Sequence, residues 1–131
     1  MTIAEVSRKY DISPDTLRYY EKIGLLPPVP RNKSGIRDYD AASCQWIEMM
    51  KCMRAAGVQI EALIEYVALY RQGDATLGAR RELLLEQREL LMARMADMQR
   101  SLDRLNEKIA LYERPNSAAC PPEREGAGPA E

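Results

Sequence analysis

The chain has 131 residues, of which 46% are hydrophobic and 30% charged, and its formal net charge is −1. This composition is typical of a globular protein, and the length allows one compact domain with an extension but not two full-size domains. No stretch approaches the roughly 20 apolar residues of a membrane span, and the N-terminus lacks the layout of a secretory signal, so we expect a cytoplasmic protein without a membrane partner.

The first part of the chain predicts two short helices joined by a tight turn. Thr2 and Glu5 have the spacing of a capping box, which starts the first helix. Ser13 followed by Pro14 is the start signal of a second helix, which we expect to run to Lys22. Two short helices separated in this way form a helix-turn-helix, whose second helix can enter the major groove of DNA.

The next segment predicts a wing and two supporting helices. Residues 25–30 are too rich in proline for a helix, and the basic loop at residues 31–35 follows them, so we expect a small β-wing. Asp40 can cap a third helix that ends at Gly57, and a fourth helix is expected from about residue 59 to residue 72. These helices should close the core over the first two.

Residues 76–113 predict one long helix with a heptad seam. The seam residues alternate spacings of three and four over most of the helix: Leu84, Leu91, Met95, Met98, Leu102, Leu105, Ile109 and Tyr112. Such a stripe needs a partner helix. Arg81 and Arg88 occupy seam positions in its first part, so we expect that end to lie against something else, the other subunit's N-terminal domain being one candidate.

These elements divide the chain into three parts. We expect a winged helix-turn-helix DNA-binding domain with its supporting helices at residues 1–73, a coiled-coil dimerisation helix at residues 74–114 and a disordered tail at residues 115–131. The fold class is therefore mainly α.

One motif resembles a known family. The run T-L-R-Y-Y-E-K-I-G-L at residues 16–25, with R-D-Y at residues 37–39 and R-A-A-G at residues 54–57, is similar to the MerR family of transcriptional regulators. The resemblance covers residues 1–113. It implies antiparallel pairing of two long helices in a homodimer that binds a pseudo-palindromic promoter element and distorts the DNA, through which it acts indirectly on RNA polymerase.

Candidate contacts to double-stranded DNA lie on the second helix, the wing and the third helix. Arg18, Tyr19, Arg37 and Arg54 offer donors for phosphates, whereas Asp15 and Thr16 near a helix start can face base edges. Tyr39 belongs to the same motif and joins this set. The alternative for these residues is an ordinary solvated face, because surface charges and phosphate contacts look alike in a sequence.

The cysteines suggest what the protein senses. The long helix begins without a thiol and the chain has no histidine, so we expect neither a metal site nor a cofactor. The run W-I-E-M-M-K-C-M-R at residues 46–54 resembles the thiol-based AdhR-like and NmlR-like branch, which responds to aldehydes and other electrophiles, and its cysteine matches Cys52. The other interpretation of Cys52 is a small apolar residue that fills a helix face. We expect Cys44 to be a packing residue and Cys120 an incidental thiol of the tail.

The leading hypothesis is a DNA-binding regulator triggered by electrophile modification of Cys52. One alternative is a coiled-coil adaptor that binds a heterologous partner protein, and another is a MerR-type regulator with a metal or small-molecule effector. An enzyme is not expected, because the sequence holds no histidine, nucleophile elbow, phosphate loop or paired-acid constellation.

Overall fold

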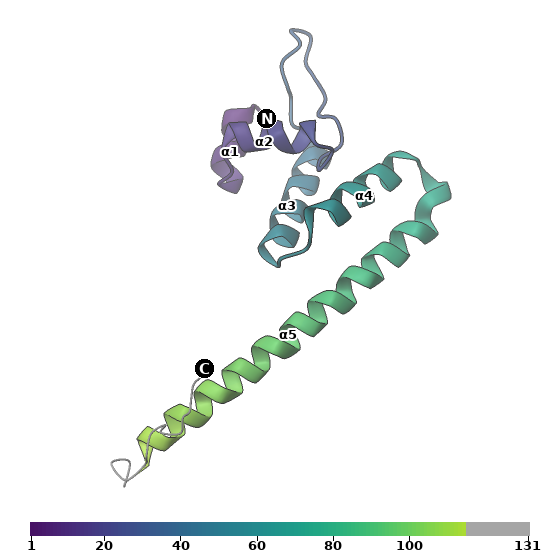
Figure 1. Cartoon of the computed structure of the whole chain (residues 1–131). Coiled ribbons are helices and arrows are strands. Elements are labelled where there is room, and N and C mark those ends of the chain that lie inside the picture. The colour runs from purple at the N-terminus through teal and green to yellow at the C-terminus, as the bar shows by residue number, and fades with distance from the viewer. Residues whose placement is uncertain (115–131) are drawn as a thin grey trace. The chain divides into compact units, whose positions relative to one another are not determined.

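The computed structural model describes residues 1–114, and their regular structure is helical. The elements in chain order are α1 (Ile3–Tyr10), α2 (Pro14–Lys22), α3 (Ala41–Ala55), α4 (Ile60–Arg71), a short 3-10 helix η1 (Asp74–Thr76) and α5 (Leu77–Glu113) (Figure 1). The chain divides into two compact units, Met1–Leu91 and a second from Met92 onward. None of the helices among residues 1–114 is both long and apolar enough to cross a membrane.

The helices begin and end at the residues that the sequence signals predict. Thr2 and Glu5 form a reciprocal capping box at α1, in which each backbone N–H donates to the other's side chain over 2.7 and 3.1 Å. Ser13 and Asp40 cap α2 and α3 through their side chains, which accept hydrogen bonds from the backbone N–H groups of Thr16 and Ser43. Gly57, after α3, has a φ of +86°, a left-handed conformation that favours glycine.

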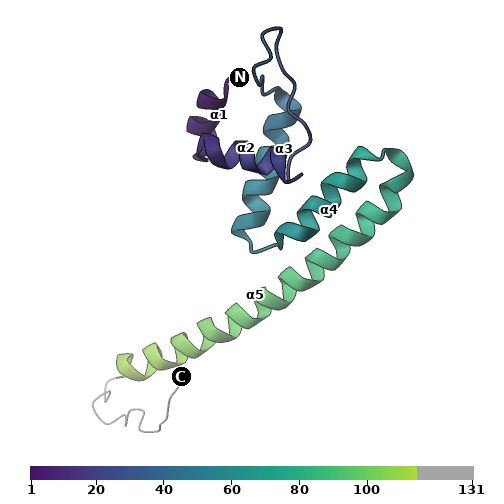
Figure 2. The ribbon, with the colours of Figure 1, turned by 45° about the horizontal axis from the view of Figure 1, so that its top comes forward.

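The core of the first unit lies where α1, α2 and α3 meet, closed by α4 and by the segment after α2 (Figure 2). Its buried members come from every element up to α4: Val6, Tyr10, Leu17, Leu25, Leu26, Val29, Tyr39, Ile47, Met50, Val58, Leu63 and Val67. The predicted closure of the core by the third and fourth helices is confirmed. Met50 is fully buried and Met53 packs against the core, so both methionines have a structural role.

The small β-wing that we expected is a loop closed by one β-bridge, between Arg31 and Arg37, with no longer strands among residues 1–114. Proline lacks a backbone N–H, and the approach to the wing contains several prolines, so few ladder bonds can form on that side. Asn32 holds the tip instead: its Oδ1 accepts hydrogen bonds from the backbone N–H groups of Ser34 and Ile36.

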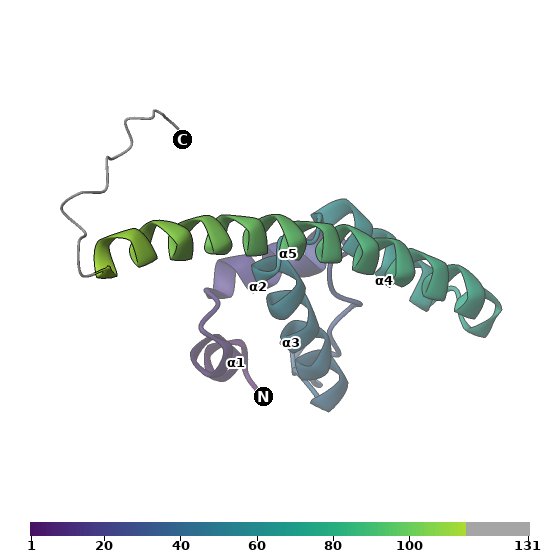
Figure 3. The same ribbon diagram turned by 90° about the horizontal axis from the view of Figure 1, so that it is seen from below.

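A buried hydroxyl fastens α4 to the start of α5. The Oγ1 of Thr76 lies 2.6 Å from the carbonyl oxygen of Leu69 and 2.8 Å from that of Gly73, and it accepts a hydrogen bond from Nε of Arg80. The Arg80 guanidinium also lies over the ring of Tyr70, at 5.5 Å from its centroid. These contacts hold α4 beside the first part of α5, within the first unit (Figure 3).

Candidate nucleic-acid interface

The exposed face of α2 carries four polar or charged side chains at helical spacing: Asp15, Arg18, Tyr19 and Lys22. The opposite face buries Leu17 and partly buries Tyr20. Arg18 donates from Nη1 to the Asp15 carboxylate over 3.0 Å, and both side chains are exposed. Such an exposed pair contributes little to stability and exchanges readily for another anion, such as a phosphate.

Thr16 lies half-buried at the start of α2. Its Oγ1 accepts a hydrogen bond from the hydroxyl of Ser13, whose Oγ in turn caps the helix at the Thr16 backbone N–H. The position of Thr16 in the first turn is the one from which a recognition helix contacts base edges. The Thr16 hydroxyl also supports the cap, because it accepts the hydrogen bond of the capping Ser13 hydroxyl.

Glu21 is the residue of this region whose role the sequence did not reveal. Its Oε1 accepts a hydrogen bond from Nε of Arg37 over 2.6 Å, and its Oε2 accepts one from the backbone N–H of Val29 over 2.9 Å. Glu21 thereby joins α2 to both ends of the wing segment. Burial raises the pKa of this carboxyl, but the hydrogen bonds from Arg37 and Val29 outweigh it, so that the pKa lies below its usual range.

The Nε of Arg37 is thus occupied by its hydrogen bond to Glu21. Its side chain is 24% exposed, so the guanidinium reaches the surface as part of an ion pair and not as a free cation. The tip of the wing presents exposed Arg31, Lys33 and Ile36, of which Arg31 donates to the Gly35 carbonyl. The sequence indicated a basic loop here but did not assign these residues to DNA binding; they extend the polar and basic surface beyond α2.

Tyr39, expected among the DNA contacts, lies in the core with 1% of its surface exposed. Its hydroxyl is buried and has no hydrogen-bond partner among the residues that the structure describes. Burial raises the pKa of this phenol. In this conformation Tyr39 offers no surface to DNA, because the motif places it at the junction of the wing and α3, directly before the α3 cap.

Arg54 is exposed near the end of α3, where its Nη1 donates to the carbonyl oxygen of Val58 over 2.8 Å. The side chain therefore closes the turn between α3 and α4 while keeping part of its guanidinium at the surface. It lies two positions from Cys52, and residues two apart on a helix do not face each other. A direct contact between these side chains is therefore not expected.

Cys52 is exposed on α3, which argues against its being a filler of the core. The two cations beside it in the sequence are both bound to backbone: Lys51 Nζ to the carbonyl of Tyr10 at 2.5 Å, and Arg54 to that of Val58. Cys44 is partly buried against the core, as expected. Burial and the neighbouring Cys44 thiol raise the pKa of Tyr10 to about 12. Cys120 and the predicted tail lie outside the described residues.

The predicted seam of α5 is uncovered in the single chain. Leu91 is half-buried, and the other seam residues are exposed, up to 71% at Met98. Across residues 1–114, no group of three or more His, Cys, Asp or Glu side chains is placed to hold a metal ion.

Comparison with known proteins gives consistent relatives. Residues 1–69 match the model of the MerR HTH family regulatory protein. The HTH-type transcriptional regulator AdhR of Bacillus subtilis is 52% identical over 92 residues, which cover 70% of this chain and 66% of AdhR, slightly less than two thirds of its length. An HTH-type transcriptional regulator from Haemophilus influenzae is 32% identical over 113 residues, which cover 86% of this chain and 84% of the relative.

Solved structures agree. A MerR family transcriptional regulator from Listeria monocytogenes superposes with a TM-score of 0.87 at 50% identity, covering 91% of this chain and 90% of that one. HiNmlR, described as a MerR family regulator that lacks the sensor domain, bound to promoter DNA, gives a TM-score of 0.77 at 32% identity and covers 86% of this chain and 89% of its own.

Proposed function

Because this chain belongs to the MerR family of helix-turn-helix transcriptional regulators and is a DNA-binding regulator, not an enzyme, we propose that it binds a pseudo-palindromic promoter element as a homodimer, distorts the DNA and responds to electrophiles through Cys52. The proposal of DNA binding rests on the exposed face of α2 beside the wing. Its geometry resembles that of a recognition helix with a flanking arm.

We assign the phosphate contacts to the α2 face and the wing. Arg18 and Tyr19 are exposed, with 54% of the Tyr19 surface accessible, and the wing tip adds Arg31 and Lys33. Arg37 and Arg54 contribute through guanidinium edges that their internal bonds leave free, whereas Asp15 and Thr16 face bases at the helix start. Tyr39 acts from the core, by fixing the junction between wing and α3.

A second copy of the chain would cover the exposed seam of α5. Exposed apolar side chains at heptad spacing mark an interaction surface, and the shared symmetry of a homodimer matches a two-fold promoter element. The first part of α5 and α4 form a separate hollow of about 360 Å³, which is lined by the apolar residues Tyr66, Leu77 and Leu84 and by the basic residues Arg81 and Arg88, among others. This hollow is where the N-terminal part of α5 would meet the other subunit.

Distortion of the promoter would follow from binding both half-sites at once. In a dimer, the two α2 helices are held at a fixed separation, so a promoter with a long spacer must bend or untwist to meet both. RNA polymerase would then be affected through the shape of the DNA. Circular permutation of a promoter fragment measures this bend, and unchanged mobility at every position of the site would contradict it.

Cys52 is the proposed trigger because it is an exposed thiol on α3, the helix that precedes the turn to α4. With an aldehyde, the thiol adds across the carbonyl: an S–C bond forms, the C=O π bond breaks, and the thiol proton ends on the oxygen as a hydroxyl. The reaction needs no oxidant. In the sequence of α3, Cys52 follows Lys51, which binds the last residue of α1, and precedes Arg54, which binds the turn after α3. The adduct would therefore form on the segment of α3 that carries both of these contacts.

Transcription from the cognate promoter, with and without formaldehyde or methylglyoxal, tests the trigger. Cys52→Ser should abolish the response, whereas Cys44→Ser, a matched control on the same helix, should retain it. Mass spectrometry of the treated protein should locate the adduct at Cys52. A full response from Cys52→Ser would exclude the thiol mechanism and favour another effector.

The coiled-coil adaptor is the second candidate, because the same exposed seam of α5 would suit a heterologous helix. It predicts that the purified chain is monomeric and acquires a partner. A homodimer measured for the pure protein would remove this candidate.

A further inference from the structure

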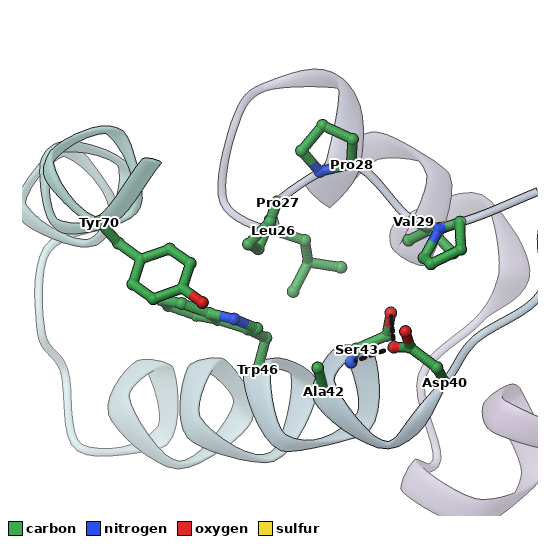
Figure 4. A pocket seen from close by; sticks show the side chains of 10 residues that line it. Leu26, Pro27, Pro28, Val29, Asp40, Ala42, Ser43, Trp46 and Tyr70 are labelled. Atoms are coloured by element: carbon green, nitrogen blue, oxygen red, sulfur yellow. Dashed lines mark hydrogen bonds between the residues drawn. The ribbon is translucent and has the colours of Figure 1, made fainter. Parts of the chain in front are cut away.

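A small pocket lies between the base of the wing, α3 and the last turn of α4 (Figure 4). Its volume is about 140 Å³. This is close to the size of an engineered apolar cavity, about 150 Å³, that takes up benzene. The pocket therefore has room for one aromatic ring.

The pocket has two chemically different ends. At one end, Trp46 and Tyr70 form an aromatic wall, with their rings edge to face at 4.9 Å between centroids, and Leu26 faces this wall. At the other end lie Asp40 and Ser43, while Ala42 forms the floor between the ends. A ligand that fits must be apolar along most of its length and polar at one tip.

The polar end favours a cation. Hydrogen bonds from the Ser43 backbone N–H and hydroxyl lower the pKa of Asp40, so this carboxylate is ionised at neutral pH. These bonds occupy Oδ1. The N-terminus of α3 contributes about half a positive charge, less than the full negative charge of the carboxylate. The amino group of Met1 is paired with the Asp38 carboxylate.

We propose that this pocket binds a small arylalkyl amine, with its ring between Leu26 and the Trp46–Tyr70 wall and its ammonium group on Asp40. The ammonium donates a charge-assisted hydrogen bond to the carboxylate, while the ring replaces water along apolar and aromatic surface. The site is separate from Cys52 and from the exposed face of α2. It gives the DNA-binding unit a ligand site of its own, at the base of the wing.

Trp46 is the only tryptophan of the sequence, so its fluorescence reports on the pocket directly. Titration of the full chain with phenethylamine should give a saturable change in Trp46 emission. Two ligands of matched size serve as controls: 2-phenylethanol, which keeps a donor without the charge, should bind more weakly, and phenylacetate, which is repelled by Asp40, should not bind. Equal binding of phenylacetate and phenethylamine, or no saturable change with phenethylamine, would overturn the proposal.

Two pairs of variants sharpen this test. Asp40→Asn keeps a good helix cap but removes the charge, so it should weaken phenethylamine by about tenfold, the loss of one charge-assisted hydrogen bond. Ala42→Leu fills the pocket and should abolish binding, whereas Ala41→Leu, on the neighbouring exposed position outside the pocket, should leave it unchanged. Wild-type affinity in Ala42→Leu would place the ligand elsewhere. The wild-type ligand series decides the proposal if a variant fails to fold.

Discussion

At the scale of single residues, Glu21 is the side chain on which the DNA-binding face depends most. It holds Arg37 and the backbone of Val29 at once, and so fixes the wing against α2. The Glu21 and Arg37 side chains are mostly buried, so their ion pair is screened less than the exposed pair between Arg18 and Asp15.

We expect Glu21→Gln to lower the free energy of unfolding by about 1–3 kcal/mol near neutral pH, because glutamine offers one acceptor oxygen, so either Arg37 Nε or the Val29 N–H faces an NH2 group that cannot accept. The folded-state pKa of Glu21 is lowered, so this contribution is complete above the ordinary glutamate value of about 4.3 and is lost as the pH falls through the folded pKa. A double-mutant cycle with Arg37→Gln, by urea denaturation at several pH values, measures the coupling. Coupling that persists unchanged in strong acid would contradict the assignment.

A variant of Tyr39 can show whether this residue acts as a core residue or as a DNA contact. Tyr39→Phe removes a buried hydroxyl that has no partner within residues 1–114, so the free energy of unfolding should stay the same or rise by up to about 1 kcal/mol. The affinity for promoter DNA should not change. A substantial loss of DNA affinity, with stability retained, would show that the hydroxyl reaches the DNA after a rearrangement.

At the scale of elements, helix boundaries were predictable because their signals are local. The caps at Thr2, Ser13 and Asp40 act within three residues, and Gly57 and Gly73 end their helices by their own backbone conformation. The extent of β-pairing in the wing, a single bridge, was not predicted, because it depends on which backbone groups face each other across a proline-rich segment. The bonds of Glu21, Arg54 and Thr76 were not predicted, because a sequence does not say which side chains meet in space.

The joint between α4 and α5 is a specific target. Thr76→Val keeps the shape of the side chain but removes its hydroxyl, which donates to the carbonyl of Leu69 or Gly73 and accepts from Nε of Arg80. Both carbonyls keep a backbone donor, from Gln72 and Thr76 respectively, so we expect a loss of about 1 kcal/mol in the free energy of unfolding, the typical net value of one hydrogen bond. Thr76→Ser, which retains the hydroxyl, should lose less. Equal stability of Thr76→Val and wild type would show that this hydroxyl does not fasten the joint.

At the scale of the whole molecule, the seam of α5 is exposed in the single chain, which supports the proposed homodimer. Periodicity in the sequence indicated the seam, and the single chain leaves it uncovered, but which helix covers it depends on a partner that one chain does not contain. In the proposed homodimer, this surface would be buried at the interface.

Leu105→Glu places a charge in the proposed seam and should shift the protein from dimer to monomer, because an unpaired carboxylate would be buried between helices. Ala96→Glu places the same charge on the opposite face of α5 and should remain dimeric. Sedimentation equilibrium of both variants measures the difference. A dimeric Leu105→Glu protein would show that the subunits join through another surface.

We expect the exposed face of α2 to bind promoter DNA. Fluorescence anisotropy with a labelled inverted-repeat promoter fragment, titrated at several salt concentrations, tests this binding. Wild type should bind with an affinity that falls as salt rises, and Arg18→Ala should bind more weakly, with a salt slope smaller by about one per site. Arg71→Ala, which removes an exposed arginine at the end of α4, should behave as wild type. The same affinity and slope for Arg18→Ala and wild type would contradict the claim.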